Sequence, residues 1–258
     1  MWRNMKTESW IDRRTGKTAF GISGNLLKWF AVITMAIDHM GAGLLESYVM
    51  NAWGGSPLGS VFLERWNELL AADHIIRTIG RPAFPIFCFL LVQGFVHTRN
   101  VKKYAVRLGI FALISEIPFD LALRITPFYW KHQNVFFTLL IGLLAIWFMK
   151  KFQNRLWARV SGLLIGAAAA ELLCTDYGAF GIALIVLLYL LRDKKAWQCI
   201  LGAVCCAWET TAPLAFLLIW FYNGKRGRQS KWFFYWFYPV HLLLYALIGM
   251  YVLPAVFL

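Results

Sequence analysis

The sequence predicts an all-α membrane protein: a polytopic bundle of about nine transmembrane helices, with the amino terminus inside and the carboxyl terminus outside. Three observations predict this class. Hydrophobic residues make up 60% of the 258 residues and charged residues only 15%, whereas a soluble domain carries about 25% charged residues. The apolar residues fall in long runs, with most lysines and arginines between them. Tryptophan and phenylalanine are abundant, which is typical of helices anchored at two lipid interfaces.

A helix needs about 20 apolar residues to cross a bilayer core that is about 30 Å thick. On this basis nine spans are predicted, at 26–46, 75–97, 104–123, 133–149, 160–174, 178–191, 196–208, 212–222 and 232–253. The first span follows a basic leader, residues 1–24, and is too long for the core of a cleavable signal peptide, so none is expected. Residues 25–258 would then form a single transmembrane domain.

Two apolar stretches are ambiguous, because each is either one long helix or a hairpin. The stretch 160–191 breaks at 175–178, and the stretch 196–222 breaks at 209–213. If both are hairpins, the cytoplasmic segments hold most of the 26 lysines and arginines, as the positive-inside rule requires. A single crossing of 160–191 would place Lys150 and Lys194 on opposite sides of the membrane. The charge distribution therefore favours hairpins.

Residues 47–74 are predicted to form the one long connection on the outer side. The segment contains a turn signal at 54–57. Beyond this turn, apolar side chains share one helical face: Leu58, Val61, Phe62, Trp66, Leu69 and Leu70. This pattern predicts a short helix that lies on the outer interface. Such a helix could cap a site or could only anchor the loop.

The net charge of +13 would suggest nucleic-acid binding in a soluble protein. Here the basic residues lie in short segments between apolar runs, so they indicate orientation in a lipid bilayer, and no nucleic-acid partner is expected. The five cysteines lie in apolar surroundings without a C-x-x-C pair, which indicates small core residues. No motif of soluble hydrolases or nucleotide-binding enzymes is found, and the histidines lack metal-ligand spacing, so no metal is expected.

Several ionisable residues lie inside the predicted spans, where each costs about 2.5–3.5 kcal/mol. Most of them fall in the outer half of the bilayer. Arg77 and Arg81 are four residues apart and share one helical face, and Glu116 and Asp120 have the same spacing on the next span. Two cations opposite two carboxylates predict ion pairs between these spans. The pairs would either hold the helices together or belong to a functional site.

Asp38 and His39 are adjacent in the outer half of the first span. Side chains of adjacent helical residues point about 100° apart, so we expect them to face two neighbours of one cavity and not each other. A neutral imidazole beside carboxylates can act as a general base or accept an acyl group. Alternatively, His39 is bonded to a backbone carbonyl and is structural. Near this level Arg81 precedes Pro82 and Pro85, which predict a bend that borders a cavity.

Several segments resemble one family of membrane proteins. Residues 28–41 read KWFAVITMAIDHMG, residues 79–100 read IGRPAFPIFCFLLVQGFVHTRN and residues 111–120 read FALISEIPFD, and shorter matches begin at Asn134, Asp176 and Tyr238. These segments are similar to the TraX family, named for the conjugative-pilus protein that acetylates the amino terminus of pilin. That family in turn resembles a wider group of membrane acyltransferases, in whose bacterial members a basic residue lies eleven positions before a catalytic histidine. Lys28 and His39 have this spacing, with lysine in place of the usual arginine.

The resemblance implies a multi-pass acetyltransferase of the bacterial plasma membrane that uses cytoplasmic acetyl-CoA. The acceptor would be an amine or hydroxyl on the outer side, in a pilin amino terminus, a peptide or a surface glycan. His39 would act as the general base or would carry the acetyl group, and Asp38 or Glu116 would orient it. Arg81 would stabilise the oxyanion. We expect acceptor binding by Arg77, Asp120, Asn134, Tyr177 and His241, and binding of CoA by Lys28, Arg226, Arg228 and Lys231.

Two other classes of protein are compatible with the sequence. A proton-coupled transporter or permease would also need buried ionisable groups for its ion pathway. A non-catalytic scaffold for pilus or surface assembly would tolerate the combined neutralisation of Asp38, His39 and Arg81. The polar residues gather on one side of the predicted bundle, and the sequence has no internal repeat of the kind found in many transporters, so the enzyme is favoured.

Overall fold

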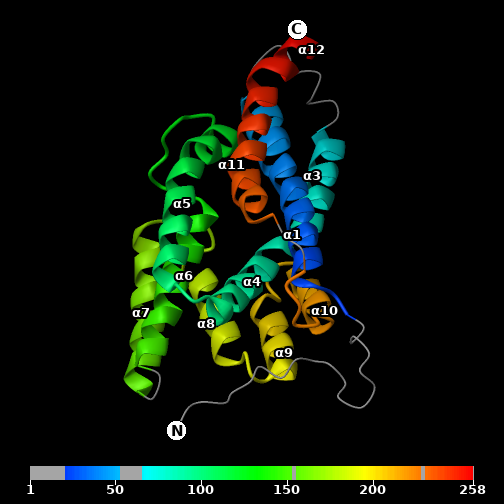
Figure 1. Ribbon diagram of the computed structural model, residues 1–258. Coiled ribbons are helices and arrows are strands. Elements are labelled where there is room, and N and C mark those ends of the chain that lie inside the picture. Colours follow the sequence, from blue (N-terminus) through cyan, green and yellow to red (C-terminus); the bar gives the residue numbers. More distant parts are fainter. Residues whose placement is uncertain (1–20, 53–65, 153–154, 228–229, 258) are drawn as a thin grey trace.

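The computed structural model describes residues 21–52, 66–152, 155–227 and 230–257. Within these ranges the predicted all-α class is confirmed, because the chain is helical apart from two isolated β-bridges. In chain order (Figure 1) the elements are α1 (Gly24–His39), η1 (Met40–Ala52), α3 (Trp66–Gly80), α4 (Ala83–His97), α5 (Val101–Arg124), α6 (Val135–Lys151), α7 (Leu156–Leu172), α8 (Gly178–Leu190), α9 (Lys195–Cys205), η2 (Ala212–Leu214), α10 (Ala215–Trp220), α11 (Lys231–Leu247), η3 (Ile248–Val252) and α12 (Leu253–Phe257).

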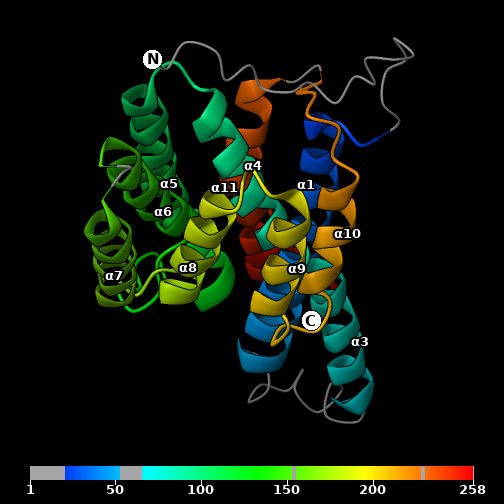
Figure 2. The same ribbon diagram turned by 90° about the horizontal axis from the view of Figure 1, so that it is seen from below.

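The helices are arranged around a central group formed by α1, α4 and α11. Helices α5, α6, α7 and α8 lie on one side of this group, and α3, α9 and α10 lie on the other (Figures 1 and 2). Helix α11 packs against α5, and α1 packs against α3, α4 and α11. The carboxyl-terminal end of α1, which carries Asp38 and His39, is therefore surrounded by helices from both sides.

Each predicted span coincides with a helical segment. Two stretches are long and apolar enough to cross a membrane, Trp66–His97 and Trp232–Ala255. Other helices are shorter: α8 has 13 residues, which corresponds to a length of about 20 Å, less than the bilayer core of about 30 Å. The structure thus bears out the positions of the helices, whereas the number of crossings and their orientation stay predictions.

The predicted outer connection at 47–74 is too long at both ends. The first helix continues through η1 to Ala52, and α3 already begins at Trp66. Neither proline nor glycine occurs between Trp66 and Ile79, so nothing in this sequence interrupts the helix. The apolar face at 66–70 is therefore the start of α3 and not a separate interfacial helix. The remainder of that predicted helix lies outside the described residues.

Both ambiguous stretches turn back on themselves, as predicted. Helices α7 and α8 pack against each other, as do α9 and α10. Three residues in the turn between α7 and α8 have positive φ angles: Cys174 at 50°, Tyr177 at 62° and Gly178 at 41°. The turn is held against the segment before α6, because the Gln133 N–H donates to the Cys174 carbonyl oxygen over 2.9 Å. This contact brings the loop before α6 and the α7–α8 turn together.

The predicted bend separates α3 from α4. Helix α3 ends at Gly80, and α4 begins at Ala83. Pro82 has no backbone N–H with which to continue the helical hydrogen bonds, while the Arg81 N–H still donates to the Arg77 carbonyl oxygen over 3.2 Å. The two helices run in different directions (Figure 1), and Arg81 is one of the two residues that connect them.

The core lies where α4, α6 and α8 meet. Val92, Leu143 and Ile185 in this region have no exposed surface. The outer surface is also apolar: Leu113 is 70% exposed and Leu172 is 83% exposed. Soluble monomers rarely expose large contiguous apolar patches, so this surface is consistent with a membrane location.

Candidate functional site

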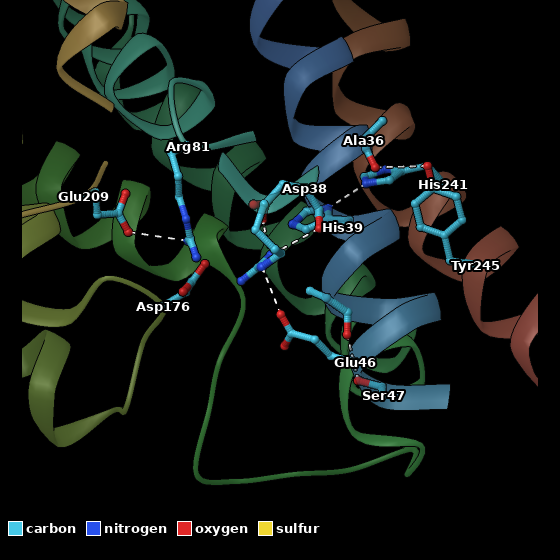
Figure 3. A network of polar contacts seen from close by, with 12 residues as sticks. Ala36, Asp38, His39, Glu46, Ser47, Arg81, Asp176, Glu209, His241 and Tyr245 are labelled. Atoms are coloured by element: carbon cyan, nitrogen blue, oxygen red, sulfur yellow. Dashed lines mark hydrogen bonds and ion pairs between the residues drawn. The ribbon is translucent and has the colours of Figure 1, made fainter. Parts of the chain in front are cut away.

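Two histidines that are distant in the sequence meet inside the bundle. His39 is the last residue of α1, and His241 lies in α11. His39 Nδ1 and His241 Nε2 are 2.7 Å apart, and the two ring planes differ by 11° (Figure 3). The ring centroids are 5.0 Å apart, which fits two rings joined edge to edge by a hydrogen bond in their common plane. His241 is only 6% exposed and His39 is half-buried, so the bond is largely sheltered.

The surrounding hydrogen bonds assign the tautomers of this histidine pair. His241 Nδ1 lies 2.7 Å from the Phe237 carbonyl oxygen, which can only accept, so His241 carries its hydrogen on Nδ1. Nε2 of a neutral His241 is then an acceptor and receives the Nδ1–H of His39. In a neutral His39 the lone pair therefore lies on Nε2. An imidazole fixed in this way can take a proton from a reacting group or can itself be acylated.

Asp38 binds an arginine and does not orient the imidazole. Its Oδ2 accepts from Arg77 Nη1 over 2.5 Å, and Arg77 Nε lies 3.1 Å from Glu46 Oε1. The close packing of α1 against α3 depends on Gly80, because a Cβ at this position would overlap with Asp38. Adjacent side chains at the end of α1 thus face different neighbours, as the helical geometry predicts.

The prediction that Asp38 or Glu116 orients His39 is corrected by these contacts, since His241 occupies that position. His241 itself was predicted to bind the acceptor. The sequence did place His241 inside the last span, but the pairing joins residues 202 positions apart. It depends on how α11 packs against α1.

Arg81 is held by groups from the α7–α8 turn and from the segment after α9. Its Nη1 lies 3.5 Å from Glu209 Oε1, and it also forms a side-chain hydrogen bond with Tyr177. The Tyr177 ring is stacked on Phe84 with centroids 3.6 Å apart, and Figure 3 shows Asp176 beside the guanidinium. Arg81 therefore joins three segments at the bend. Glu209, its partner, was not among the predicted site residues.

The two carboxylates of α5 bind backbone and amide groups. Glu116 Oε2 accepts from the Asn134 side-chain amide, and Asp120 Oδ2 accepts from the Tyr129 N–H over 2.7 Å. Asn134 also caps α6, because its Oδ1 accepts from the Phe136 N–H over 3.0 Å. Asn134 and Asp120 are 0% and 1% exposed, so their surroundings favour a structural role and not the predicted acceptor binding.

The predicted ion pairs between the second and third spans are not formed. Helix α5 and helix α3 lie on opposite sides of the central helices (Figures 1 and 2). The arginines consequently bind carboxylates of α1, η1 and the segment after α9, as described above. Spacing along one helix predicts a shared face, but it does not predict which neighbour that face meets.

A cavity of about 550 Å³ enters the bundle beside the start of α1 and the end of α4. Basic side chains from four segments surround its mouth: Lys28, His97, Arg107 and Arg226. The Lys28 Nζ lies 5.4 Å from the centre of the Phe234 ring, and the Arg107 guanidinium lies 5.8 Å from the centre of the Tyr104 ring. The inner part is mostly apolar, and its lining includes Met35, Val135, Phe136, Leu139 and Tyr238. The volume is within the range of about 300–1,000 Å³ that is typical of ligand pockets.

Two of the four predicted CoA-binding residues line this mouth, Lys28 and Arg226. Arg228 lies outside the described residues, and Lys231 begins α11 without a described side chain. Arg107 was not predicted to bind CoA, although a basic residue one turn into the predicted span 104–123 is costly and could have been noticed.

The part of the cavity lining that comes from α1 lies on the same face as His39, although His39 itself does not line the cavity. Lys28, Met35 and His39 are separated by seven and four residues, so they lie on the same side of the helix. At 1.5 Å per residue, Lys28 and His39 are about 16 Å apart along the axis. Met35 lines the inner part of the cavity, and His39 lies one turn further. Tyr238 also lines the cavity, and its ring centroid is 5.6 Å from that of His39.

The described residues thus form a helical protein whose apolar outer surface is consistent with a membrane location. Its cavity has basic side chains in the lining, and one lining residue, Tyr238, contacts the histidine pair. The chain belongs to the TraX family, since the family model described as TraX protein matches residues 23–249. This range includes both histidines and most of the cavity lining, and it confirms the resemblance seen in the sequence.

The chain is also similar to a curated protein sequence. The protein of Dichelobacter nodosus named "Probable fimbrial assembly protein FimC, serogroup H1" is 28% identical to this chain over 248 residues, which are 84% of this chain and 92% of the relative. No solved structure matches the chain.

Proposed function

We propose that this protein is a multi-pass membrane acetyltransferase that moves an acetyl group from cytoplasmic acetyl-CoA to an amine or hydroxyl on the outer side of the bacterial plasma membrane. The observation that carries the proposal is the position of His39, one turn beyond Met35 and in ring contact with Tyr238, two residues that line a cavity with basic side chains. The hydrogen bonding of His39 leaves Nε2 with its lone pair. Packing alone accounts for neither feature. A cavity of this size is unusual because well-packed interiors contain few voids. The histidine pair is unusual because moving a polar side chain from water into the interior costs free energy.

The membrane arrangement is supported by the helices and their basic flanks. The predicted spans coincide with helices. The short helices α7 to α10 form two hairpins, in which α7 packs against α8 and α9 against α10. The cavity mouth lies among Lys28, Arg107 and Arg226, at the end that the positive-inside rule assigns to the cytoplasm. This is the compartment that contains acetyl-CoA.

The shape of the cavity suits a donor with an anionic head and a thin arm. The phosphates of CoA would lie at the basic mouth, where Arg107 and Arg226 can bind their oxygens. The pantetheine arm would follow α1 past Met35 toward His39. Apolar lining in the inner part suits the acetyl group and the thioester, which carry no charge.

In the proposed reaction, the acceptor nitrogen or oxygen attacks the thioester carbonyl carbon while its proton passes to His39 Nε2. The tetrahedral intermediate then collapses by breaking the carbon–sulfur bond. The CoA thiolate takes the proton from His39, and the products are the acetylated acceptor and free CoA. His241 keeps the imidazole in the required orientation by accepting its Nδ1–H.

A fimbrial or pilus subunit is the proposed acceptor, because the relative from Dichelobacter nodosus is named as a fimbrial assembly protein. An amine is favoured by the charges on the outer side of His39. The carboxylates of Asp38, Glu46 and Asp73 outnumber the neighbouring cations Arg77 and Arg81. The surplus of negative charge would attract an ammonium group.

The test is transfer of labelled acetyl from acetyl-CoA by the purified protein to a peptide with the amino terminus of the pilus subunit. His39→Ala should fold and lose transfer by about 100-fold or more, the size of a general-base contribution. His74→Ala provides the control, because His74 is exposed on α3. Retained transfer by His39→Ala would remove this residue from the mechanism. Uptake of a solute into vesicles without any acetyl transfer would indicate a transporter instead.

A further inference from the structure

Tyr238 has a buried hydroxyl group without a hydrogen-bond partner of ordinary geometry. The residue is 2% exposed, lies in α11 three positions before His241 and lines the cavity. Its ring contacts those of His39 and His241 edge to face, with centroids 5.6 Å and 5.8 Å away. The phenol group therefore lies between the inner end of the cavity and the histidine pair.

An unpaired hydroxyl in this position is costly. Leaving a buried polar group without a partner costs about 1–3 kcal/mol, and phenylalanine would fill the same space without that cost. The hydroxyl oxygen is buried beside the first turn of α6: Val135 and Phe136 line the cavity together with Tyr238, and the Val135 N–H lies close to the hydroxyl oxygen, which leaves the hydroxyl hydrogen to donate. The position suits a donor that awaits a ligand oxygen.

The first turn of α6 lies beside the same hydroxyl but offers little free positive potential. The amide end of a helix carries about half a positive charge. Here Asn134 caps the Phe136 N–H, and Glu116 Oε2 accepts from the Asn134 N–H over 3.3 Å and from its side-chain amide. The Tyr238 hydroxyl is therefore the donor on which a ligand oxygen would depend.

Resting on the proposed function, we propose that the Tyr238 hydroxyl forms an oxyanion site for the thioester carbonyl of acyl-CoA. When the acceptor attacks, the carbonyl π electrons move onto the oxygen, and Tyr238 stabilises this oxyanion by donating its O–H without losing the proton. When the carbon–oxygen double bond re-forms, the carbon–sulfur bond breaks and the thiolate leaves. The tyrosine is unchanged after each turnover.

This site takes over the role that the sequence assigned to Arg81. The Arg81 guanidinium is bound to Glu209 at the bend between α3 and α4, and Arg81 does not line the cavity. Tyr238 does line it and is in contact with His39. A donor carbonyl at the end of the cavity therefore meets Tyr238.

The test is the variant Tyr238→Phe, which removes one oxygen atom and keeps the ring. We expect kcat to fall about 100-fold, as for the loss of one oxyanion donor, while the Kd of free CoA, which has no acyl carbonyl, stays within twofold. The matched control is Tyr245→Phe on the same helix, whose hydroxyl donates to the Ala36 carbonyl oxygen, and it should change kcat by no more than about twofold. Equal kcat values for Tyr238→Phe and the wild type would overturn the inference.

A binding experiment separates the inference from the proposed function. S-acetonyl-CoA keeps a carbonyl group and cannot transfer it, whereas S-propyl-CoA lacks the carbonyl. The wild type should bind the acetonyl compound about tenfold more tightly, and Tyr238→Phe should bind both equally. If the wild type binds both compounds with the same affinity, the oxyanion site is refuted while the donor site stands. If it binds neither compound nor CoA, the proposed function fails and the inference fails with it.

Discussion

Removal of the hydrogen-bond acceptor for His39 should slow acetyl transfer without unfolding the protein. The substitution His241→Leu replaces a buried imidazole by an apolar side chain that still fills much of the space in α11. The lost hydrogen bond is 2.7 Å long, lies in the plane of both rings and is formed by a residue that is 6% exposed. The His39 Nδ1–H would be left without its partner, and the ring could rotate or change tautomer.

The magnitude follows from the value of such a bond. A buried donor without a partner costs about 1–3 kcal/mol, and each 1.36 kcal/mol of transition-state stabilisation corresponds to a tenfold change in rate. We therefore expect kcat to fall by about 10- to 100-fold. The substitution His241→Gln places an amide oxygen near the position of the imidazole Nε2, so it should accept the same hydrogen and restore most of the loss.

The assay is the initial rate of labelled acetyl transfer, measured over a range of acetyl-CoA concentrations so that kcat and KM are separated. KM should change little, because His241 does not line the donor cavity. Circular dichroism and thermal unfolding in detergent show whether each variant is folded. Equal rates for the folded leucine variant and the wild type, or equal losses for leucine and glutamine, would refute the role of the histidine pair.

Three further predictions concern the cavity mouth and the helix packing. Lys28→Met should raise the KM for acetyl-CoA at least about tenfold with little change in kcat, because a hydrogen bond to a charged group is worth about 1.5–3 kcal/mol; steady-state kinetics measure this. Gly80→Val should lower the thermal unfolding temperature by several degrees, since its side chain would overlap with α1. Gly109→Ala, which meets only ordinary contacts, should not lower it. Glu209→Gln should destabilise the fold by about 1 kcal/mol, because Arg81 is 27% exposed and partly solvated, and adding Arg81→Met should recover stability in the same unfolding assay.

Much of the fold could be predicted from the sequence, because most helices correspond to apolar runs and the turns correspond to proline or glycine residues within a few positions. The bend at Pro82 and the hairpin turn at 175–178 are set by residues within a few positions, and both are found where they were expected. The ends of the outer connection could not be predicted. Residues 40–52 contain Gly41 and Gly43, and residues 66–74 contain several polar side chains, so no continuous apolar run marks either segment as part of a span.

The sequence singles out individual candidate residues, but it does not predict their contacts. The costs of burial identify His39, Lys28 and Arg81 one at a time, since each is a polar group in an apolar run. Which groups bind each other depends on the packing of helices that are far apart in the sequence. Tyr238 carries no such signal, because a tyrosine in a span is typical of an interfacial anchor and costs little.

The placement of His39 offers a reason for building an acyl transfer site inside a membrane. The phosphates of CoA are too strongly hydrated to enter a bilayer core, so the proposed donor must leave its head at the cytoplasmic mouth. Lys28 and His39 are about 16 Å apart along α1, which is about half of a bilayer core of about 30 Å. The uncharged acetyl group alone needs to travel this distance, carried by the arm of CoA. The acceptor likewise needs to insert only its reacting group past Asp38 and Arg77, so that transfer across the membrane requires neither substrate to cross it.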